Sequence, residues 1–401
     1  MSNINRKIIV NNLGKKILLS SFWILLIFYF SLRSIADVSS SCTAVPLPTA
    51  NTPKVEIHAD GITIVNGKPF FPFGFYDVSW KSTADERMNH LRDIADAGFN
   101  TIHASVTRLD DYEAFLDEAE RLGVYVLSEQ NVGLLNLVNA FKHKPAVLGW
   151  SIADDVDDGT WPPQKVLESH QQVKASDPNH ITYVSGYSES IGRFANCSDV
   201  IAIQSYPIKV GKAELSSTYS KVSVARDAIA KFNGAVYANL QTFNWSFTNR
   251  PEYKDARIPT FSEVRNMTYQ ALLAGAKGII YYAYHDRGWH LPDSSNLWKE
   301  LKSLVPEIKA VSSSLLEGDF REINTGVKNV LAGIWVSKDQ ALTVIVNNSY
   351  KNNAEVAIEL PVGISEARPM FQGRPSGMSV KEGKLSGSLN PLEVHVYSLK
   401  A

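Results

Sequence analysis

The strongest constraint on the fold is a regular alternation of short apolar runs with stretches of helical periodicity. Apolar runs of strand length occur at residues 70–77, 101–105, 124–127, 147–152, 181–185, 200–204, 236–240 and 279–284. A helical connection separates each run from the next, and a last helix is expected at 297–316. Eight strands alternating with helices over about 250 residues predict a (β/α)8 barrel, the TIM barrel. A doubly wound fold is disfavoured because no Gly-rich phosphate loop follows any strand.

The pattern changes near Gly318, where alternation with a period of two replaces helical spacing. Such runs lie at 330–336, 342–347, 356–360 and 394–399, separated by turn signals. Strands without intervening helices predict a small antiparallel β-sandwich. We therefore expect a barrel over residues 55–318 and a sandwich over 319–401.

The N-terminus has the character of a targeting segment, because basic residues precede an apolar run at 17–32. This order predicts a signal peptide or signal anchor over residues 1–36, which directs the remainder across a membrane. Residues 37–54, rich in Ser, Thr, Pro and Ala, are expected to form a linker. We therefore expect an extracytoplasmic protein, secreted or membrane-anchored, with lipidation of Cys42 left open.

Charge and cysteine content narrow the possible partners. The formal net charge is -1, and no long basic stripe is present to neutralise phosphates, so no nucleic acid partner is expected. With two cysteines, one of them in the linker, a disulfide framework is not expected. His103 and His285 lack the neighbouring ligands of a zinc site apart from His290, so we predict no metal and no cofactor.

Acidic residues follow the apolar run at 147–152, in the text AVLGWSIADDVDD. Barrels place their chemistry at the carboxyl ends of the strands, which is where Asp154 and Asp155 fall. Glycoside hydrolysis needs a protonated acid and a second carboxylate. Glu129, beyond the run at 124–127, is the favoured partner, with Asp286 and Asp77 as alternatives. The predicted catalytic residues are therefore Asp155, Glu129 and Asp154, each of which has a structural role as its alternative.

Aromatic and polar side chains also recur at the predicted strand ends. Aromatic rings there can stack on the apolar faces of sugars, and polar groups can bond to sugar hydroxyls. The predicted substrate-binding residues are Tyr76, Asp77, His103, Trp150, Gln204, Tyr206, Gln241, Trp245, Tyr284, Asp286 and Trp289. Alternate residues on a barrel strand face the helices, so packing is the competing explanation for each ring.

Several phrases together suggest a family: GKPFFPFGFY, LRDIADAGFNTI, AERLGVYVL, LGWSIADD and EVRNMTYQALLAGAKGIIYYAY. From residue 55 to 401 the chain resembles the glycoside hydrolases of the large retaining barrel clan, especially β-galactosidase-like and cellulase-like members with a C-terminal β-sandwich. Those sequences carry Asp-Glu-Pro after the fourth strand, the glutamate being the acid/base; here Asp155 and Val156 occupy the last two positions. Their nucleophile is a glutamate on the seventh strand, where this chain has Gln241.

The resemblance implies hydrolysis of O-glycosidic bonds in an oligo- or polysaccharide. In this interpretation Asp155 donates the proton, its pKa raised by Trp150 and Asp154, and Gln241 bonds to the sugar. The missing seventh-strand glutamate favours the wider carboxylate spacing of inverting enzymes. A non-catalytic carbohydrate-binding or polysaccharide-assembly protein is the main alternative, because the catalytic pattern is incomplete. A polysaccharide lyase is a further alternative, since Tyr and His can abstract a proton.

Overall fold

The computed structural model describes residues 53–129, 133–211, 213–338 and 340–400. The predicted targeting segment lies outside these ranges, as do Cys42 and all but the last two residues of the predicted linker. In the described part of the chain, no helix is both long and apolar enough to cross a bilayer.

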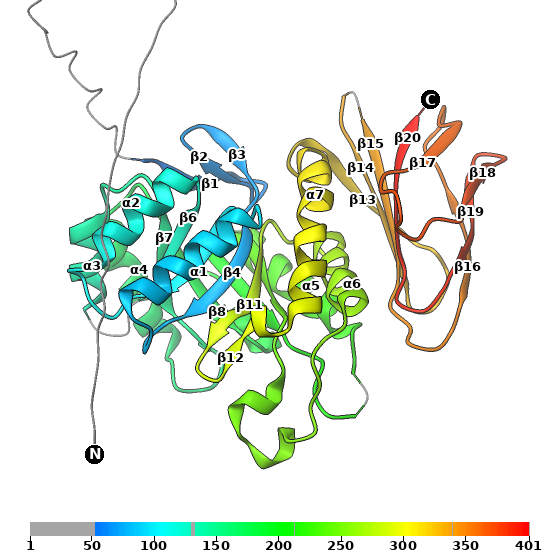
Figure 1. Ribbon diagram of the computed structural model, residues 1–401. Helices are drawn as coiled ribbons and strands as arrows, with labels where there is room; N and C mark the ends of the chain where they lie inside the picture. The colour runs from blue at the N-terminus through cyan, green and yellow to red at the C-terminus, as the bar shows by residue number, and fades with distance from the viewer. Residues whose placement is uncertain (1–52, 130–132, 212, 339, 401) are drawn as a thin grey trace, which may run out of the picture. The chain divides into compact units, whose positions relative to one another are not determined.

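A closed ring of parallel strands forms the centre of the fold (Figure 1). Within the described residues its eight strands are β4 (Phe73–Val78), β5 (Thr101–Ser105), β6 (Tyr125–Glu129), β7 (Val147–Ala153), β8 (Ile181–Gly186), β9 (Val200–Ser205), β10 (Ala235–Gln241) and β11 (Ile279–Asp286). Neighbours in chain order pair in parallel, and β11 closes the ring by pairing with both β10 and β4. The predicted (β/α)8 barrel is therefore confirmed.

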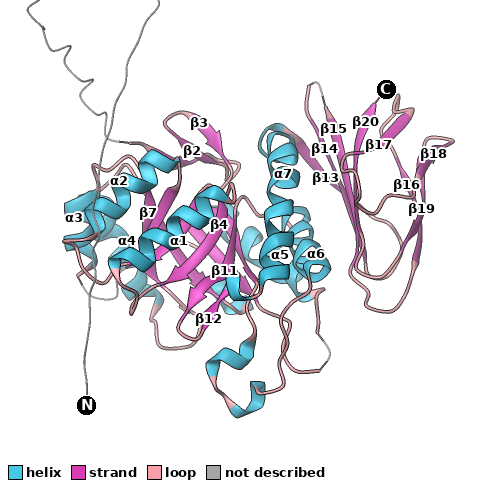
Figure 2. Cartoon of the chain, in the orientation of Figure 1, coloured by secondary structure: helices cyan, strands magenta, loops and turns pink. Residues whose placement is uncertain are grey.

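Helices cover the outside of the barrel (Figure 2). They are α1 (Ala84–Asp96), α2 (Tyr112–Leu122), α3 (Leu134–Phe141), α4 (Pro163–Ser176), α5 (Ser217–Ile229), α6 (Phe261–Leu273) and α7 (Ser295–Glu317). Between β8 and β9 the short 3-10 helix η1 (Glu189–Phe194) takes the place of a full helix. Local sequence explains the ends: Thr83 and Glu86 form a capping box at the start of α1, and Gly123 ends α2 with φ +70°.

A hairpin precedes the barrel, as the Asn66-Gly67 dipeptide predicts. It joins β2 (Thr63–Val65) to β3 (Lys68–Phe70), and both turn residues have positive φ, 51° and 77°. Strand β1 (Val55–Ile57) pairs with β2 and completes a three-stranded sheet. The expected strand at 70–77 is wrong at its start, because Phe70 pairs with Thr63 in the hairpin. Pro72 follows and has no N–H for a ladder, and β4 begins after it.

Strand β7, which leads to the acidic turn, is irregular in register. Val147 pairs with Val126 whereas Gly149 pairs with Leu127, so Leu148 is an extra residue in the ladder. A second irregularity lies between Ser151 and Ala153, on the β8 side. Each bulge reverses which face of the barrel the following side chains occupy. The inward and outward positions on β7 therefore do not follow simple alternation.

An antiparallel β-sandwich follows α7 and confirms the predicted C-terminal fold. One sheet has the order β13-β14-β15-β20-β17 and the other β16-β19-β18. The strands are β13 (Asp319–Ile323), β14 (Val330–Val336), β15 (Ala341–Asn347), β16 (Ala354–Glu359), β17 (Glu366–Pro369), β18 (Ser379–Lys381), β19 (Lys384–Leu389) and β20 (Val394–Lys400). The facing sheets enclose their own apolar core, which includes Ile345, Ile358 and Leu385.

The sandwich is joined to the barrel through α6. Arg265 donates from Nε to Glu307 at 2.9 Å and from Nη1 to the carbonyl oxygen of Val394 at 2.9 Å. The adjacent Asn266 donates from Nδ2 to the carbonyl oxygen of Asn347 at 2.9 Å. Because these groups are almost fully buried, the bonds satisfy polar atoms that would otherwise be costly to bury. The barrel and the sandwich accordingly form one compact unit.

Candidate active site

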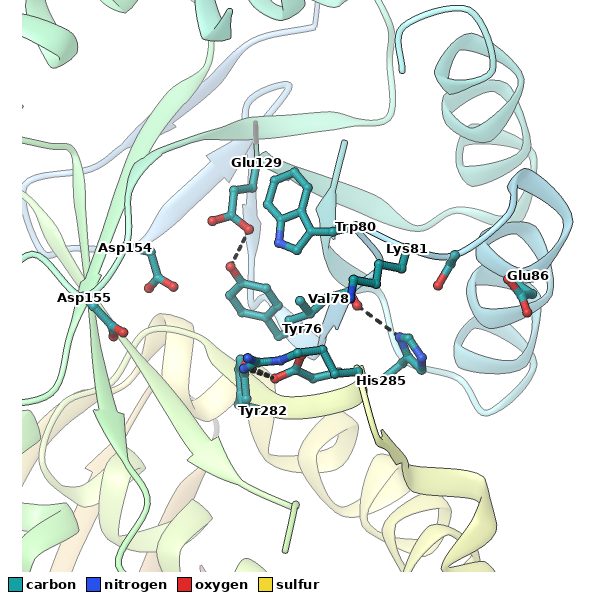
Figure 3. A pocket seen from close by; sticks show the side chains of 13 residues that line it. Tyr76, Val78, Trp80, Lys81, Glu86, Glu129, Asp154, Asp155, Tyr282 and His285 are labelled. Carbon is teal, nitrogen blue, oxygen red and sulfur yellow. Dashed lines mark hydrogen bonds and ion pairs between the residues drawn. The ribbon is translucent and has the colours of Figure 1, made fainter. Parts of the chain in front are cut away.

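A groove lies at the carboxyl ends of the barrel strands. It consists of two adjoining cavities, of about 730 and about 470 Å³. Asp154, Asp155, Tyr282 and Arg287 line both cavities, so the two form one continuous groove with the acidic turn near its middle. Figure 3 shows the larger cavity, with Glu129 on the same side as the two aspartates. The sequence prediction that the strand-end acids meet is thus realised in one cavity.

Glu129, the last residue of β6, is 7% exposed and lines the larger cavity. Tyr76 on β4 donates from its hydroxyl to Glu129 Oε2 at 2.5 Å, and Ser105 donates to the same oxygen at 3.3 Å. Burial and the nearby charge of Asp154 raise the pKa of Glu129 to about 8, against the opposing effect of these hydrogen bonds. At neutral pH this carboxyl therefore carries a proton.

Asp154 and Asp155 follow β7 directly and differ in environment. Asp154 is half-buried and accepts bonds from the Ser185 hydroxyl and, at 3.3 Å, from Gln204 Nε2. Burial and the charge of Asp155 raise the pKa of Asp154 to about 6. Asp155 faces solvent in the groove, and Gln204 Nε2 donates to it at 2.8 Å. The pKa of Asp155 is also raised, first by desolvation, and the bond from Gln204 opposes the shift.

The backbone of Asp155 adopts a left-handed conformation, with φ 49°. Aspartate tolerates this region better than most residues, yet it remains uncommon outside glycine and is often found at functional sites. The turn is held by two main-chain bonds: Val156 N–H donates to the Ser185 carbonyl, and Asp158 N–H to the Asp155 carbonyl, both at 3.0 Å. This turn projects neighbouring carboxylates from the end of one strand into the groove.

The other two candidates for a second carboxylate are already paired. Asp286 is fully buried and accepts bonds from Tyr282 Oη at 2.7 Å and from Arg287 Nε at 3.0 Å. Asp77 is also fully buried, does not line the groove, and bonds to His90 Nδ1 at 2.9 Å. Of the acids weighed as partners of Asp155, only Glu129 lines the cavity without an arginine partner among the described residues.

The predicted substrate-binding residues divide into two groups. Those that line the groove are Tyr76, Gln204, Tyr206, Trp245 and Asp286. Those that do not are Asp77, His103, Trp150, Gln241, Tyr284 and Trp289. The second group consists of side chains buried beneath the groove wall or turned towards the helices.

Trp150 does not face the groove. Because of the bulge at Leu148, the Trp150 side chain points into the helical layer, where its Nε1 donates to Asp177 at 2.8 Å. Trp150 therefore does not provide the pKa shift expected for Asp155. Tyr284 likewise faces outward, and its hydroxyl donates to Asp93 on α1 at 2.7 Å. Trp289 is buried and donates from Nε1 to the carbonyl of Ala283 at 3.0 Å.

His103 supports the cavity wall from below. Its ring centroid lies 3.8 Å from that of Tyr76, and its Nε2 lies 3.9 Å from Glu129 Oε2. Complete burial lowers the pKa of His103 to about 3, so the imidazole is neutral. A neutral buried ring beneath Tyr76 packs that tyrosine against Glu129.

Gln241, predicted to bond to the sugar, has a structural role in this fold. It is fully buried, and its Nε2 donates to the carbonyls of Ile208 at 2.7 Å and Phe243 at 3.0 Å. Its Oε1 accepts from the Ile208 N–H at 2.8 Å. The side chain thus ties the loops that follow β9 and β10, and the groove lining does not include it.

This bonding predicts that Gln241→Glu destabilises the fold instead of restoring a nucleophile. A carboxylate oxygen would replace the amide nitrogen that faces two carbonyls, so that oxygen would have no donor, and the Ile208 N–H alone would bond to the buried acid. We expect the free energy of unfolding to fall by about 3 kcal/mol in denaturant titrations. Gln171→Glu, on the exposed face of α4, is the matched control and should change stability little. A variant as stable as the parent would contradict the structural role of Gln241.

Several groove residues escaped the sequence prediction. The smaller cavity is lined by Lys209 and Tyr253 beside the expected Trp245, and the Lys209 ammonium lies 4.9 Å from the Trp245 ring centroid. Trp245 and Tyr253 lie on η3 (Trp245–Thr248) and η4 (Pro251–Tyr253), in the long connection after β10. The larger cavity includes Trp80, two residues beyond β4. For Trp80 and Tyr253 the sequence signal was an aromatic residue in a loop that follows a barrel strand, and Lys209 had no such signal.

Comparison with known proteins supports the fold. No family model matches the sequence, and no curated protein matches it. Solved structures do resemble it. A family GH30 endoxylanase from Clostridium papyrosolvens C71 has a TM-score of 0.51 at 12% identity, covering 87% of this chain and 100% of that one. Amy13B from Eubacterium rectale has a TM-score of 0.56 at 10% identity, covering 87% and 97%. An Anoxybacillus alpha-amylase has a TM-score of 0.54 at 14% identity, covering 82% of this chain and 97% of that one. The protein therefore has the fold of these glycoside hydrolases, a barrel followed by a β-sandwich.

Proposed function

We propose that this protein hydrolyses O-glycosidic bonds in an extracytoplasmic oligo- or polysaccharide. The observation that carries the proposal is the set of acids in the groove: the pKa of Glu129 is raised to about 8, so it is protonated at neutral pH, while that of Asp154 is about 6. Acids whose environments separate their protonation states are what glycoside hydrolysis requires. The extracytoplasmic location rests on the basic and apolar N-terminal segment.

In this proposal Glu129, and not Asp155, donates the proton to the leaving oxygen. A general acid must hold its proton at the working pH, and Glu129 has the pKa of about 8. Asp155 is the second carboxylate, because it is open to the groove and bonded only by Gln204 among its described neighbours. Asp154 raises the pKa of Glu129 through its charge, and Ser185 and Gln204 hold it in place.

The reaction follows from these positions. The C1–oxygen bond breaks as Glu129 gives its proton to the leaving oxygen, and Asp155 removes a proton from a water that attacks C1. Water activation inverts the anomeric centre and needs a carboxyl separation of roughly 6.5 to 9.5 Å, whereas direct attack needs about 5 to 5.5 Å. We propose inversion, because the buried Gln241 leaves no acid at the seventh-strand position. Proton NMR of the first product formed would identify the anomer.

The pH dependence of kcat/KM should be bell-shaped. Activity needs Glu129 protonated, so it falls as pH rises through about 8, where that carboxyl loses its proton. It also falls on the acid side, through about 6, because a proton taken up by Asp154 and its neighbour Asp155 leaves less carboxylate to accept a proton from the attacking water. A profile without the alkaline limb would contradict Glu129 as the donor.

A carbohydrate-binding protein on a barrel without catalysis is the second candidate, favoured by the structural use of Gln241. Incubating the purified protein with a panel of neutral and acidic glycans separates the possibilities. Release of reducing sugar supports hydrolysis, and an unsaturated product would instead indicate a lyase. Saturable binding without any product would support the binding protein and overturn the proposed hydrolysis.

A further inference from the structure

A second cluster of polar side chains lies where the first and last barrel strands meet. Asp77 is on β4, His90 on α1 and His285 on β11. One possible ligand atom from each lies within 4.8 Å of the other two. The ring centroids of His90 and His285 are 5.0 Å apart, and the His290 ring lies 5.6 Å from that of His90. Imidazoles and a carboxylate therefore converge from separate elements.

Asp77 is the buried centre of this cluster. It is fully buried, and its Oδ1 lies 2.9 Å from His90 Nδ1 and 3.9 Å from His285 Nδ1. Its other oxygen, Oδ2, has no hydrogen-bond partner among the described residues. A buried carboxylate oxygen without a partner is costly, and the glycosidase mechanism makes no use of it. A cation bound by the Asp77 carboxylate would offset this cost.

The distances fit a metal ion of ordinary size. Ligand atoms that each lie about 2.1 Å from a tetrahedral ion are roughly 3.4 Å from one another. The Asp77–His90 and Asp77–His285 separations, 2.9 and 3.9 Å, lie on either side of this value. The protons of two hydrogen bonds occupy the same nitrogen atoms: His90 Nδ1 bonds to Asp77, and His285 Nδ1 donates to the Val78 carbonyl at 3.0 Å. An ion would take the place of those protons.

We propose that Asp77, His90 and His285 form a binding site for a divalent transition metal ion such as Zn²⁺. Nitrogen ligands from histidine with one carboxylate suit zinc and its neighbours better than Ca²⁺ or Mg²⁺, which prefer oxygen. Of the three ligands, His285 also lines the larger cavity, so it connects the site with the groove. The ion would tie β4, α1 and β11 together at the closing seam of the barrel.

The sequence analysis predicted no metal site because it weighed His103 with His285. His103 is on the inner wall beneath Tyr76, whereas the ligand near His285 is His90, on α1. Helix α1 presents His90 to the end of β4 because Leu91 and Ile94 on the same helix are buried in the core. Only the folded arrangement brings His90 next to His285.

Metal binding can be measured without any glycan, so its outcome is independent of the proposed hydrolysis. The full chain, freed of metal by dialysis against a chelator, is titrated with Zn²⁺ in a calorimeter and with Co²⁺ in a spectrophotometer. We expect one ion per chain, visible d–d absorption from Co²⁺, and a melting temperature that rises with Zn²⁺ concentration. Absence of saturable binding by the parent protein would overturn the proposal.

Variants test which residues hold the ion. Asp77→Asn and His285→Ala should each lose the Co²⁺ absorption and the Zn²⁺-dependent rise in melting temperature. His143→Ala, at an exposed histidine outside the cluster, is the control and should keep both. Should Asp77→Asn fail to fold, His285→Ala decides, because its side chain is 21% exposed and easier to replace. Binding in His285→Ala equal to that of the parent would refute the assignment.

Discussion

Glu129→Gln should lower turnover of an unactivated glycoside by about a thousandfold. Glutamine has nearly the shape of the protonated side chain and can still accept the bond from Tyr76, but it has no acidic proton to give. A nitrophenyl glycoside needs little protonation of its leaving group, so the same variant should lose much less activity on it. Comparing kcat/KM on the two substrates measures the proton donation itself.

Two further measurements make this result specific. Glu120→Gln, an exposed residue on α2, is the matched control and should leave both rates unchanged. The folded-state pKa of Glu129, about 8, lies above its ordinary value of 4.5, so the folded state binds more protons between these values. The free energy of unfolding of the parent should therefore fall as pH rises through this range, and less so in the variant. Equal losses on both glycosides would remove Glu129 from the donor role.

The barrel could be predicted from sequence because parallel strands are buried on both faces. Such strands appear as largely apolar runs, and the run predicted at 200–204 matches β9, which begins at Val200. The meeting of Glu129 with Asp154 and Asp155 followed from the same topology, because all strands of the barrel end at one face. The sandwich was recognisable from strict alternation, as in β14 (Val330–Val336).

The direction of individual side chains could not be predicted, because the barrel strands are irregular. The ladder between β11 and β4 shifts between Tyr281 and His285, so Tyr282 lines the groove while Tyr284 faces Asp93. Trp150 was assigned to the groove for the same reason, since one extra residue in β7 reverses the alternation. Register is a property of how two strands pair, and the sequence of one strand does not reveal where its pairing shifts.

The proposal that Glu129, and not Asp155, is the proton donor also rests on the folded structure. Sequence spacing placed Asp155 in the position of the family's acid/base, and that argument ignores burial. Glu129 is 7% exposed whereas Asp155 is open to the groove, and burial is the largest cause of the raised pKa of Glu129. Desolvation depends on atoms from many strands, so it is invisible in any one segment.

Asp155→Asn should remove hydrolysis of both kinds of glycoside, again by about a thousandfold, because activation of water is needed whichever group leaves. Folding should be preserved, since asparagine also tolerates the positive φ of 49° at this position and can keep a contact with Gln204. Sugar affinity, measured by calorimetry, should change little, as expected for a group that acts in the transition state.

The matched control for Asp155→Asn is Asp227→Asn on α5, an exposed acid that is absent from the groove lining. The contrast with Glu129→Gln then separates the two roles. Glu129→Gln should keep most activity on the nitrophenyl glycoside, whereas Asp155→Asn should lose it. Unchanged turnover in Asp155→Asn would refute its role. If Asp154→Asn alone caused a large loss of turnover, the role of the base would pass to Asp154. That carboxylate accepts bonds from Ser185 and Gln204, and its charge raises the pKa of Glu129.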